Sequence, residues 1–132
     1  MGRGWSFGWS SFSEQTGEDR VDIHTRNQQD AAVIEIQGDV DMYTSPQVRA
    51  AIVGATKRRA PTVIVDLTGV GYMDSSGVAT LVEGLQFCRG YGGAFRLAGL
   101  AEAVRQVFRF AKLDTVFDIY PSAGEALSPP KA

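Results

Sequence analysis

The side chains best suited to chemistry in this sequence stand together in the segment Asp74-Ser75-Ser76-Gly77. The segment joins a β-branched run to a stretch with helical periodicity, and open α/β sheets place their sites at such strand-to-helix junctions. A helix start explains part of the pattern, because Ser75 can serve as the N-cap residue and the Asp74 carboxylate can lie beside the positive end of the helix dipole. This interpretation gives Ser76 no function, so the segment is a candidate site.

One face of the predicted helix carries almost no side-chain bulk. Ser76, Thr80 and Gly84 recur along it at i, i+4 and i+8, opposite or oblique to the apolar stripe, and Gly77 lies beside them. A solvated helix face is usually rich in Glu and Lys, whereas a smooth face lets another protein approach closely. Two interpretations therefore stay open, a docking surface or an accident of composition.

A serine nucleophile finds no catalytic partners in this sequence. The only histidine, His24, falls on the solvent side of the first predicted strand, and no Gly-x-Ser-x-Gly elbow is formed, because the one match to that pattern, at 4–8, follows no predicted strand. No group of Cys, His and Asp residues has the spacing of metal ligands, and no Walker-type phosphate loop occurs. We therefore predict that the protein is not an enzyme, with no catalytic residues, no cofactor and no metal ion.

Asp66 raises a different possibility, because it follows a buried strand, as the phosphoacceptor of a response-regulator receiver does. A receiver also needs an acidic pair after its first strand and a late lysine to handle Mg²⁺ and phosphate. The strand predicted at 21–25 is followed by no such pair, which argues against a receiver.

Length and composition place the chain among ordinary globular proteins. Its 132 residues suit one domain, and 44% hydrophobic with 21% charged residues is a typical balance. A net charge of -2 without a basic stripe argues against nucleic acid as a partner. No run reaches the roughly 18 apolar residues of a transmembrane segment, and no secretion signal is present. Together with the single Cys88, which cannot form an internal disulfide, these features predict a cytoplasmic protein.

Hydrophobic periodicity predicts strands that alternate with helices. The run at 62–67 is nearly all β-branched, which is typical of a strand buried on both faces, and we expect it at the centre of the sheet. The pattern indicates an α/β fold, a mixed sheet of about five strands covered mainly by four helices. The predicted strands are 21–25, 31–37, 62–67, 94–98 and 116–120, and the predicted helices are 45–59, 75–89, 101–111 and 122–127.

Three local patterns refine this scheme. The first two strands are expected to pair in antiparallel fashion through a turn at 27–30. The first helix can begin with Ser45 as N-cap before Pro46, or with a capping box of Thr44 and Gln47. The third helix is expected to turn Val104, Val107, Phe108 and Ala111 inward.

The first 20 residues differ from the rest. Aromatic residues stand there among Gly and Ser and are followed by a polar run, so we predict a flexible leader at 1–20, a folded domain at 21–127 and a tail at 128–132. The aromatic side chains could contact a partner or a membrane surface, or fold back on the domain, and the sequence leaves this open. They are Trp5, Phe7, Trp9 and Phe12.

At this point the sequence shows a resemblance to a known family. The stretch VIVDLTGVGYMDSSG at 63–77, with Gly38-Asp39-Val40-Asp41 before the first helix, resembles STAS domains, and among them the bacterial anti-sigma factor antagonists. The resemblance covers about 21–127 and includes VRQVF at 104–108 and LDTVF at 113–117. It implies the STAS fold. The sequence departs from the family in its aromatic leader and at Lys112, where a glycine commonly precedes the leucine.

The resemblance also implies a function. In that family the first serine after the aspartate is phosphorylated by an anti-sigma factor that is itself a serine kinase, and the dephosphorylated form binds this partner and frees the sigma factor. Here that serine is Ser75, and a serine phosphatase is implied as a second partner. The expected partner-binding residues are Asp41, Asp74, Ser76, Gly77, Thr80 and Gly84.

Such a switch is physically reasonable at this position. A phosphoryl group on Ser75 adds a charge of about -1.5 to -2 at a helix amino end, which tolerates anions, so the domain need not unfold. The dianion beside Asp74 would instead be desolvated and repelled when an acidic or apolar partner surface closes over it.

An alternative keeps the fold and changes the partner. A STAS subunit of a lipid or anion transporter would use the same helix face to dock on an ATPase, without a kinase. The intact Asp-Ser-Ser-Gly segment favours the phosphoswitch.

Overall fold

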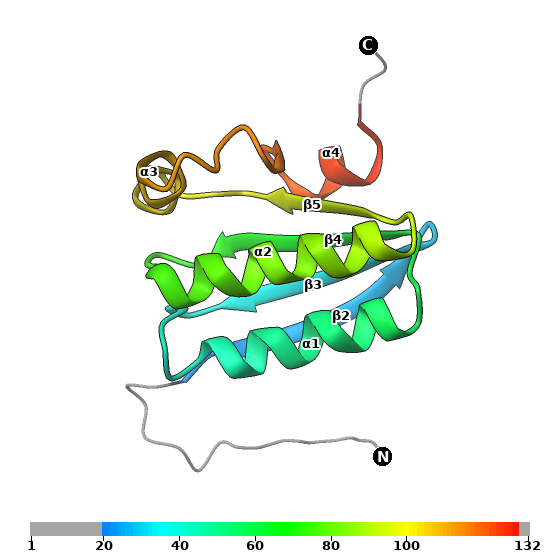
Figure 1. Ribbon diagram of the computed structural model, residues 1–132, viewed down its shortest axis with the longest axis horizontal. Coiled ribbons are helices and arrows are strands. Elements are labelled where there is room, and N and C mark those ends of the chain that lie inside the picture. Colours follow the sequence, from blue (N-terminus) through cyan, green and yellow to red (C-terminus); the bar gives the residue numbers. More distant parts are fainter. Residues whose placement is uncertain (1–19, 130–132) are drawn as a thin grey trace.

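The computed structural model describes residues 20–129, so the predicted leader, apart from Arg20, and the last three residues of the predicted tail lie outside the described residues. Within this range the chain forms five strands and four helices (Figure 1). The strands are β2 (Asp22–Gln28), β3 (Ala31–Gln37), β4 (Thr62–Gly69), β5 (Ala94–Ala98) and β6 (Asp118–Tyr120). The helices are α1 (Ser45–Lys57), α2 (Ser75–Gly90), α3 (Glu102–Phe110) and α4 (Ala123–Leu127).

The strands form one mixed sheet in the order β2-β3-β4-β5-β6. β2 pairs with β3 in antiparallel fashion, and the other neighbours are parallel, which confirms the predicted α/β fold with its central third strand. β2 runs three residues further than predicted, because its pairing with β3 continues to Gln28 although its side chains there are exposed. Gln29 and Asp30 then make the turn with positive φ angles of 53° and 65°, as a two-residue hairpin requires.

The two faces of the sheet are covered unequally. α1 and α2 lie across one face, in the foreground of Figure 1, and Val63, Val65 and Leu67 of β4 join the large core beneath them. Ile64 points to the other face, where it packs with Ala126 of the short helix α4. This double burial explains why β4 is apolar almost without interruption.

α3 is held by one aromatic contact and then ends in a tight turn. The rings of Phe108 and Phe117 meet edge to face with centroids 5.4 Å apart. Lys112 has a φ of 59°, and its amide donates to the carbonyl of Arg109 at 3.0 Å. The Leu113 amide donates to the Phe108 carbonyl at 2.8 Å, so the end of α3 is a Schellman motif. Lys112 thus occupies a left-handed position that glycine would fill without a steric penalty.

This turn corrects the prediction for the inward face of α3. Val104 and Phe108 are buried as expected, but Val107 is only partly buried and Ala111 is exposed. The helix ends at Phe110, so Ala111 already belongs to the turn and no longer faces the core.

The smooth face of α2 is packed against the rest of the domain. A Cβ atom on Gly84 would lie 2.9 Å from Ile52 of α1 and 2.9 Å from the Phe95 ring of β5. A Cβ atom on Gly77 would lie 2.6 Å from the Met73 side chain. Small residues stand here because α2 approaches α1 and the sheet too closely for anything larger.

The docking-surface interpretation of this face is therefore wrong for three of its residues. Gly77 and Gly84 are buried, and Thr80 is only 8% exposed, with its hydroxyl donating to the Ser76 carbonyl at 3.0 Å. Ser76 is the one member of the face that stays partly exposed.

We predict that Gly84→Ala destabilises the domain by about 1–3 kcal/mol, because the added methyl group overpacks the contact with Ile52 and Phe95. Gly90→Ala, at the end of the same helix with open space around it, should leave stability unchanged or raise it by up to ~1 kcal/mol. Urea unfolding of both variants measures the difference. Equal midpoints would show that α2 does not pack in this way.

Candidate functional site

The candidate site lies where two loops run side by side beyond the carboxyl ends of β3 and β4. The amide of Val40 donates to the Tyr72 carbonyl at 3.0 Å, and the Asp74 amide donates to the Val40 carbonyl at 3.1 Å. These bonds make a parallel bridge between Val40 and Met73. The next residue in each loop is an aspartate, so the structure brings Asp41 and Asp74 into neighbouring positions.

Asp74 begins α2. Its backbone is extended, with φ -106° and ψ -172°, and its Oδ1 atom accepts a hydrogen bond from the Ser76 amide at 2.9 Å. Its carbonyl accepts from the amides of Gly77 and Val78 at 3.1 and 3.2 Å. Asp74 is therefore the N-cap residue, and the prediction that Ser75 caps the helix is wrong. The aspartate both caps the chain end and places negative charge at the positive end of the helix.

Ser75 therefore does not cap α2. It is the first residue of α2 and is exposed, and within residues 20–129 its hydroxyl forms no hydrogen bond. The hydroxyl stands at the first turn of a 16-residue helix, where the positive end of the helix dipole favours an anion.

Asp41 organises the loop before α1. Its Oδ1 atom accepts hydrogen bonds from the amides of Tyr43 at 2.9 Å and Thr44 at 3.1 Å, and its carbonyl accepts from Ser45 at 2.8 Å. The Thr44 hydroxyl donates to the Asp39 carbonyl at 2.8 Å. Thr44 is the N-cap residue of α1 but makes no side-chain capping bond, so neither predicted cap forms. Asp41 takes over that task from outside the helix.

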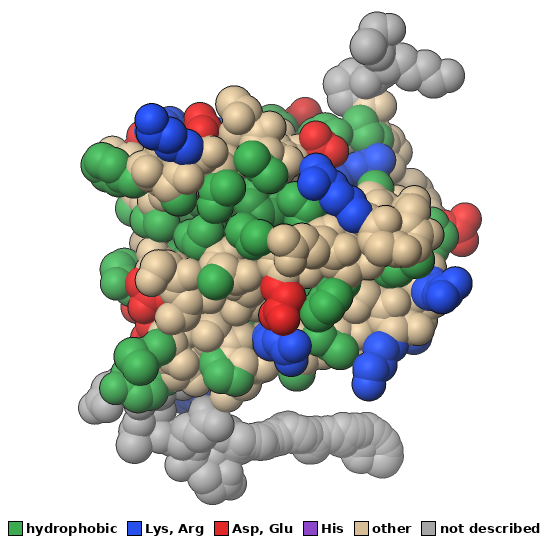
Figure 2. All heavy atoms as spheres, in the orientation of Figure 1, with side chains coloured by type: hydrophobic (Ala, Val, Ile, Leu, Met, Phe, Trp, Pro, Cys, Tyr) green, Lys and Arg blue, Asp and Glu red, His purple; other side chains and the backbone are tan. Residues whose placement is uncertain are grey.

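Large apolar side chains surround these loops. Met42 is 63% exposed, Tyr43 is 64% exposed and Tyr72 is 51% exposed. Hydrophobic side chains lie along the left edge of Figure 2, where Figure 1 places the two loops. Sequence reasoning missed these residues, because loops have no periodicity that marks a side chain as exposed. Their type alone, large and apolar beside an acidic segment, was the available signal.

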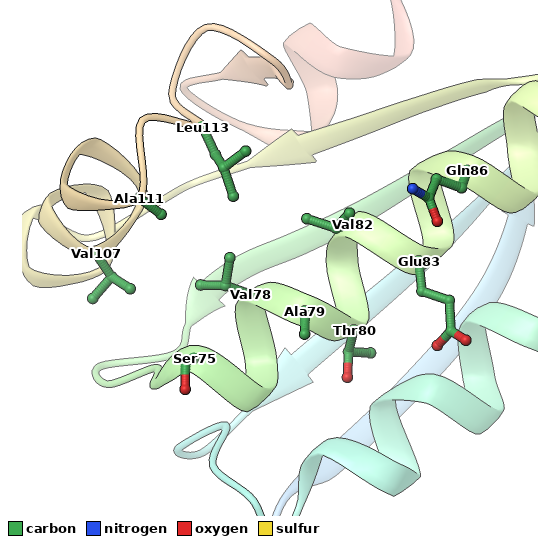
Figure 3. Close-up of a pocket in the computed structure, with 10 residues that line it drawn as sticks. All are labelled: Ser75, Val78, Ala79, Thr80, Val82, Glu83, Gln86, Val107, Ala111 and Leu113. Carbon is green, nitrogen blue, oxygen red and sulfur yellow. The ribbon is translucent and has the colours of Figure 1, made fainter.

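A groove begins at Ser75 and runs between α2 and α3 (Figure 3). We call it the α2–α3 groove; its volume is about 660 Å³. Ser75 lies at one end and Gln86 at the other, and a band of hydrophobic side chains marks it on the face shown in Figure 2. It is lined by Ser75, Val78, Ala79, Thr80, Val82, Glu83, Gln86, Val107, Ala111 and Leu113.

Comparison with known protein families identifies the fold. A family model described as the STAS domain matches residues 22–126. The chain belongs to the STAS domain family. The predicted family and fold are confirmed.

Relatives of this STAS domain include proteins named as anti-sigma factor antagonists. The chain is 26% identical over 99 residues to an anti-sigma-B factor antagonist of Bacillus subtilis (strain 168), covering 75% of this chain and 90% of the relative. An anti-sigma factor antagonist from Mycobacterium paratuberculosis has a crystal structure that matches with a TM-score of 0.78 at 24% identity, over 86% of this chain and 97% of that one.

A third relative has been solved in two states. The anti-sigma factor antagonist SpoIIAA in its unphosphorylated form matches with a TM-score of 0.70 at 26% identity, over 80% of this chain and 93% of that one. The Bacillus SpoIIAA in its phosphorylated form matches with a TM-score of 0.65 at 24% identity, over 80% and 96%.

The side chains considered for other chemistry lie on β2, β4 and α2. His24 is exposed on β2, and the Asp66 carboxylate accepts hydrogen bonds from the amide and hydroxyl of Thr68 at 3.0 and 2.6 Å. Cys88 is buried, which raises the pKa of its thiol. In the described part of the chain, no three or more His, Cys, Asp or Glu side chains are grouped to hold a metal ion. None of the helices between residues 20 and 129 is long and apolar enough to cross a membrane.

One ion pair borders the groove and ties α2 to α1. Both carboxylate oxygens of Glu83 accept from Arg49, at 2.7 and 3.1 Å. The hydrogen bonds from Arg49 lower the pKa of the Glu83 carboxyl, so the pair stays ionised at neutral pH. Both side chains face solvent, and the pair orients the helices more than it stabilises them.

The cap assignment makes a stability prediction. Asp74→Ala should lower the free energy of unfolding by about 0.5–2 kcal/mol, because the Ser76 amide loses its acceptor. Asp74→Asn keeps an acceptor and should recover most of the loss. Ser75→Ala should change stability little, since this hydroxyl caps nothing. Thermal and urea unfolding measure all three, and a larger loss for Ser75→Ala than for Asp74→Ala would reverse the assignment.

Proposed function

We propose that this STAS domain is an antagonist of an anti-sigma factor. It binds an anti-sigma factor and thereby frees a sigma factor, and phosphorylation of Ser75 stops this binding. The observation that carries the proposal is the exposed hydroxyl of Ser75, which has no structural task and stands at the amino end of α2 beside Asp41 and Asp74. The names of the relatives support the same binding role, which is regulatory and not enzymatic.

The local geometry suits a modification that leaves the fold intact. Asp74 caps α2 and Asp41 holds the loop before α1, so both elements keep their hydrogen bonds when Ser75 carries a phosphoryl group. The helix amino end tolerates the added charge of about -1.5 to -2. SpoIIAA, which shares the fold, has been solved in both phosphorylated and unphosphorylated forms.

The partner surface is the rim of the two loops and not the small face of α2. Met42, Tyr43 and Tyr72 expose apolar area around the site, and large aromatic residues of this kind often anchor protein interfaces. Asp41, Asp74 and the partly exposed Ser76 supply the polar contacts. Gly77, Thr80 and Gly84 act from below. Gly84 lets α2 approach Ile52 of α1, Gly77 lets it rest on Val40 and Met73, and the buried Thr80 bonds within the helix.

The switch works by desolvation and charge. The proposed partner covers the three apolar side chains and also Ser75, which begins α2 directly after the loop that carries Tyr72. A dianion at that position loses its hydration shell on binding and meets Asp41 and Asp74 as like charges. The partner is thus an anti-sigma factor with serine kinase activity, a serine phosphatase restores binding, and a cytoplasmic location follows from these partners.

The transporter alternative uses the same face for an ATPase but gives the free Ser75 hydroxyl no purpose. Genes for a kinase-type anti-sigma factor and a phosphatase beside this one support the switch. A neighbouring permease and ATPase would support the transporter.

The binding prediction concerns the charge at Ser75. Ser75→Asp should weaken binding to the serine-kinase anti-sigma factor of the same organism at least about tenfold, equivalent to ~1.4 kcal/mol, because a carboxylate at this point is desolvated in the complex. Ser75→Ala should bind as the unmodified protein does. Isothermal titration calorimetry measures both. If the two variants bind equally well, charge at Ser75 is not the switch.

The modification itself can be located by mass spectrometry. Incubation with the kinase and ATP should add one phosphoryl group at Ser75, which is exposed, and none at Ser76, which is only partly exposed. Ser75→Ala should abolish the modification, and Ser76→Ala, the matched control, should retain it. Phosphate on Ser76 in the unmodified protein would contradict the assignment.

A further inference from the structure

The α2–α3 groove is an apolar surface that the fold itself leaves open. Val78, Val82, Val107 and Leu113 are the large apolar side chains that line it. Glu83 is the single charged residue among the described residues that line it, and Arg49 already neutralises that charge. A contiguous apolar groove of this size favours an uncharged, apolar occupant.

We propose that the groove binds the aromatic leader of this same chain, with Trp5, Phe7 and Trp9 as the inserted side chains. Residues 4–13 have the matching chemistry, because they carry no charged side chain and are otherwise Gly and Ser. Trp and Phe bury large apolar areas with few rotatable bonds, so a short segment can bind through them.

The leader joins the domain beside the strand ends from which the two loops of the site begin. The Arg20 carbonyl lies 2.9 Å from the point where a Cβ on Gly38 would stand, and Gly38 pairs with Gly69 at the ends of β3 and β4. Two residues further on, Val40 bonds to Asp74, the neighbour of Ser75. Summed chain and bond lengths along this path put Ser75 within roughly 25 Å of Arg20.

The reach of the leader is sufficient. The chain from Phe12 to Arg20 extends to about 26–29 Å, so Phe12 can stand at the Ser75 end of the groove. The residues before it then run along the groove.

The spacing of the aromatic residues fits the length of the groove. Trp5, Phe7 and Trp9 stand at alternate positions, so an extended chain turns all three toward the same side. They span about 13 Å at 3.3 Å per residue. The groove follows α2 from Ser75 to Gln86, which is about 16 Å at 1.5 Å per residue.

A leader in this groove covers the approach to Ser75. On the proposed function it competes with the anti-sigma factor for that end of α2, and this consequence rests on the proposed function. Docking of the leader does not.

Tryptophan fluorescence tests the docking directly, because Trp5 and Trp9 are the two tryptophans of the sequence and both stand in the leader. The full chain should emit at shorter wavelength, and resist quenching by acrylamide, compared with a synthetic peptide of residues 1–19. Ala79→Lys places a long cationic side chain in the groove from an exposed position of α2, and should return the emission and quenching to those of the peptide.

The matched control is Ala50→Lys, the same change at an exposed position of α1 outside the groove, which should behave as the unmodified chain. Circular dichroism and urea unfolding establish that both variants are folded. Emission equal to that of the peptide in the unmodified chain, or a blue shift that survives Ala79→Lys, overturns the proposal.

Varying the protein concentration tests the other possible occupant of the groove, the leader of a second copy of the chain. If the blue shift disappears on dilution while sedimentation shows a dimer turning into monomer, the groove holds the leader of a second copy and the intramolecular proposal is wrong. No kinase or anti-sigma factor is present in these measurements, so their outcome is independent of the proposed function.

Discussion

The site depends on the backbone pairing of Val40 with the loop after β4. This pairing carries the parallel ladder of β3 and β4 past the ends of the strands and fixes both loops against each other. Gly77 completes the arrangement, because only a residue without a side chain lets the first turn of α2 rest on Val40 and Met73. The orientation of the helix amino end, and of Ser75 on it, follows from these contacts between residues distant in sequence.

The two carboxylates show how structural and functional tasks are divided here. Asp74 caps α2 and Asp41 organises the loop before α1. Each carboxylate accepts hydrogen bonds from backbone amides, and none of these bonds involves the Ser75 hydroxyl. The free serine can therefore change its charge without removing a hydrogen bond from the fold. Such a charge would act at the surface that carries the two acids and the exposed tyrosines, which is the proposed partner surface.

Local sequence patterns predicted the strands and helices well. Features that depend on backbone conformation or tertiary contacts could not be predicted from them. The limits of β3 and β5 agree with the alternation and burial of their side chains, and the apolar run of β4 identified the central strand. The cap was misplaced by one residue, because Asp and Ser are both good N-cap residues and only the backbone conformation distinguishes them.

The docking-surface interpretation of the smooth face of α2 was wrong because the pattern itself is ambiguous. Small residues at i, i+4 and i+8 are the signature both of a surface open to a partner and of a helix pressed against another helix, and the choice depends on where α1 lies. The junction 74–77 could be found from residue types alone, whereas the roles of Ser75 and Asp41 came from the family resemblance. Neither the residue types nor the resemblance identified Met42, Tyr43 and Tyr72, because apolar residues in loops follow no periodic pattern.

The groove owes its shape to the way α3 ends. Phe108 anchors the helix on Phe117, and the Schellman turn at Lys112 directs Leu113 back toward α2 without letting it fill the space between the helices. One wall of the groove therefore belongs to the helix that starts with Ser75, and the other to a helix fixed independently by the core. A segment bound between them is in contact with the amino end of α2, so its binding and the state of Ser75 are coupled by proximity, with no change of fold required.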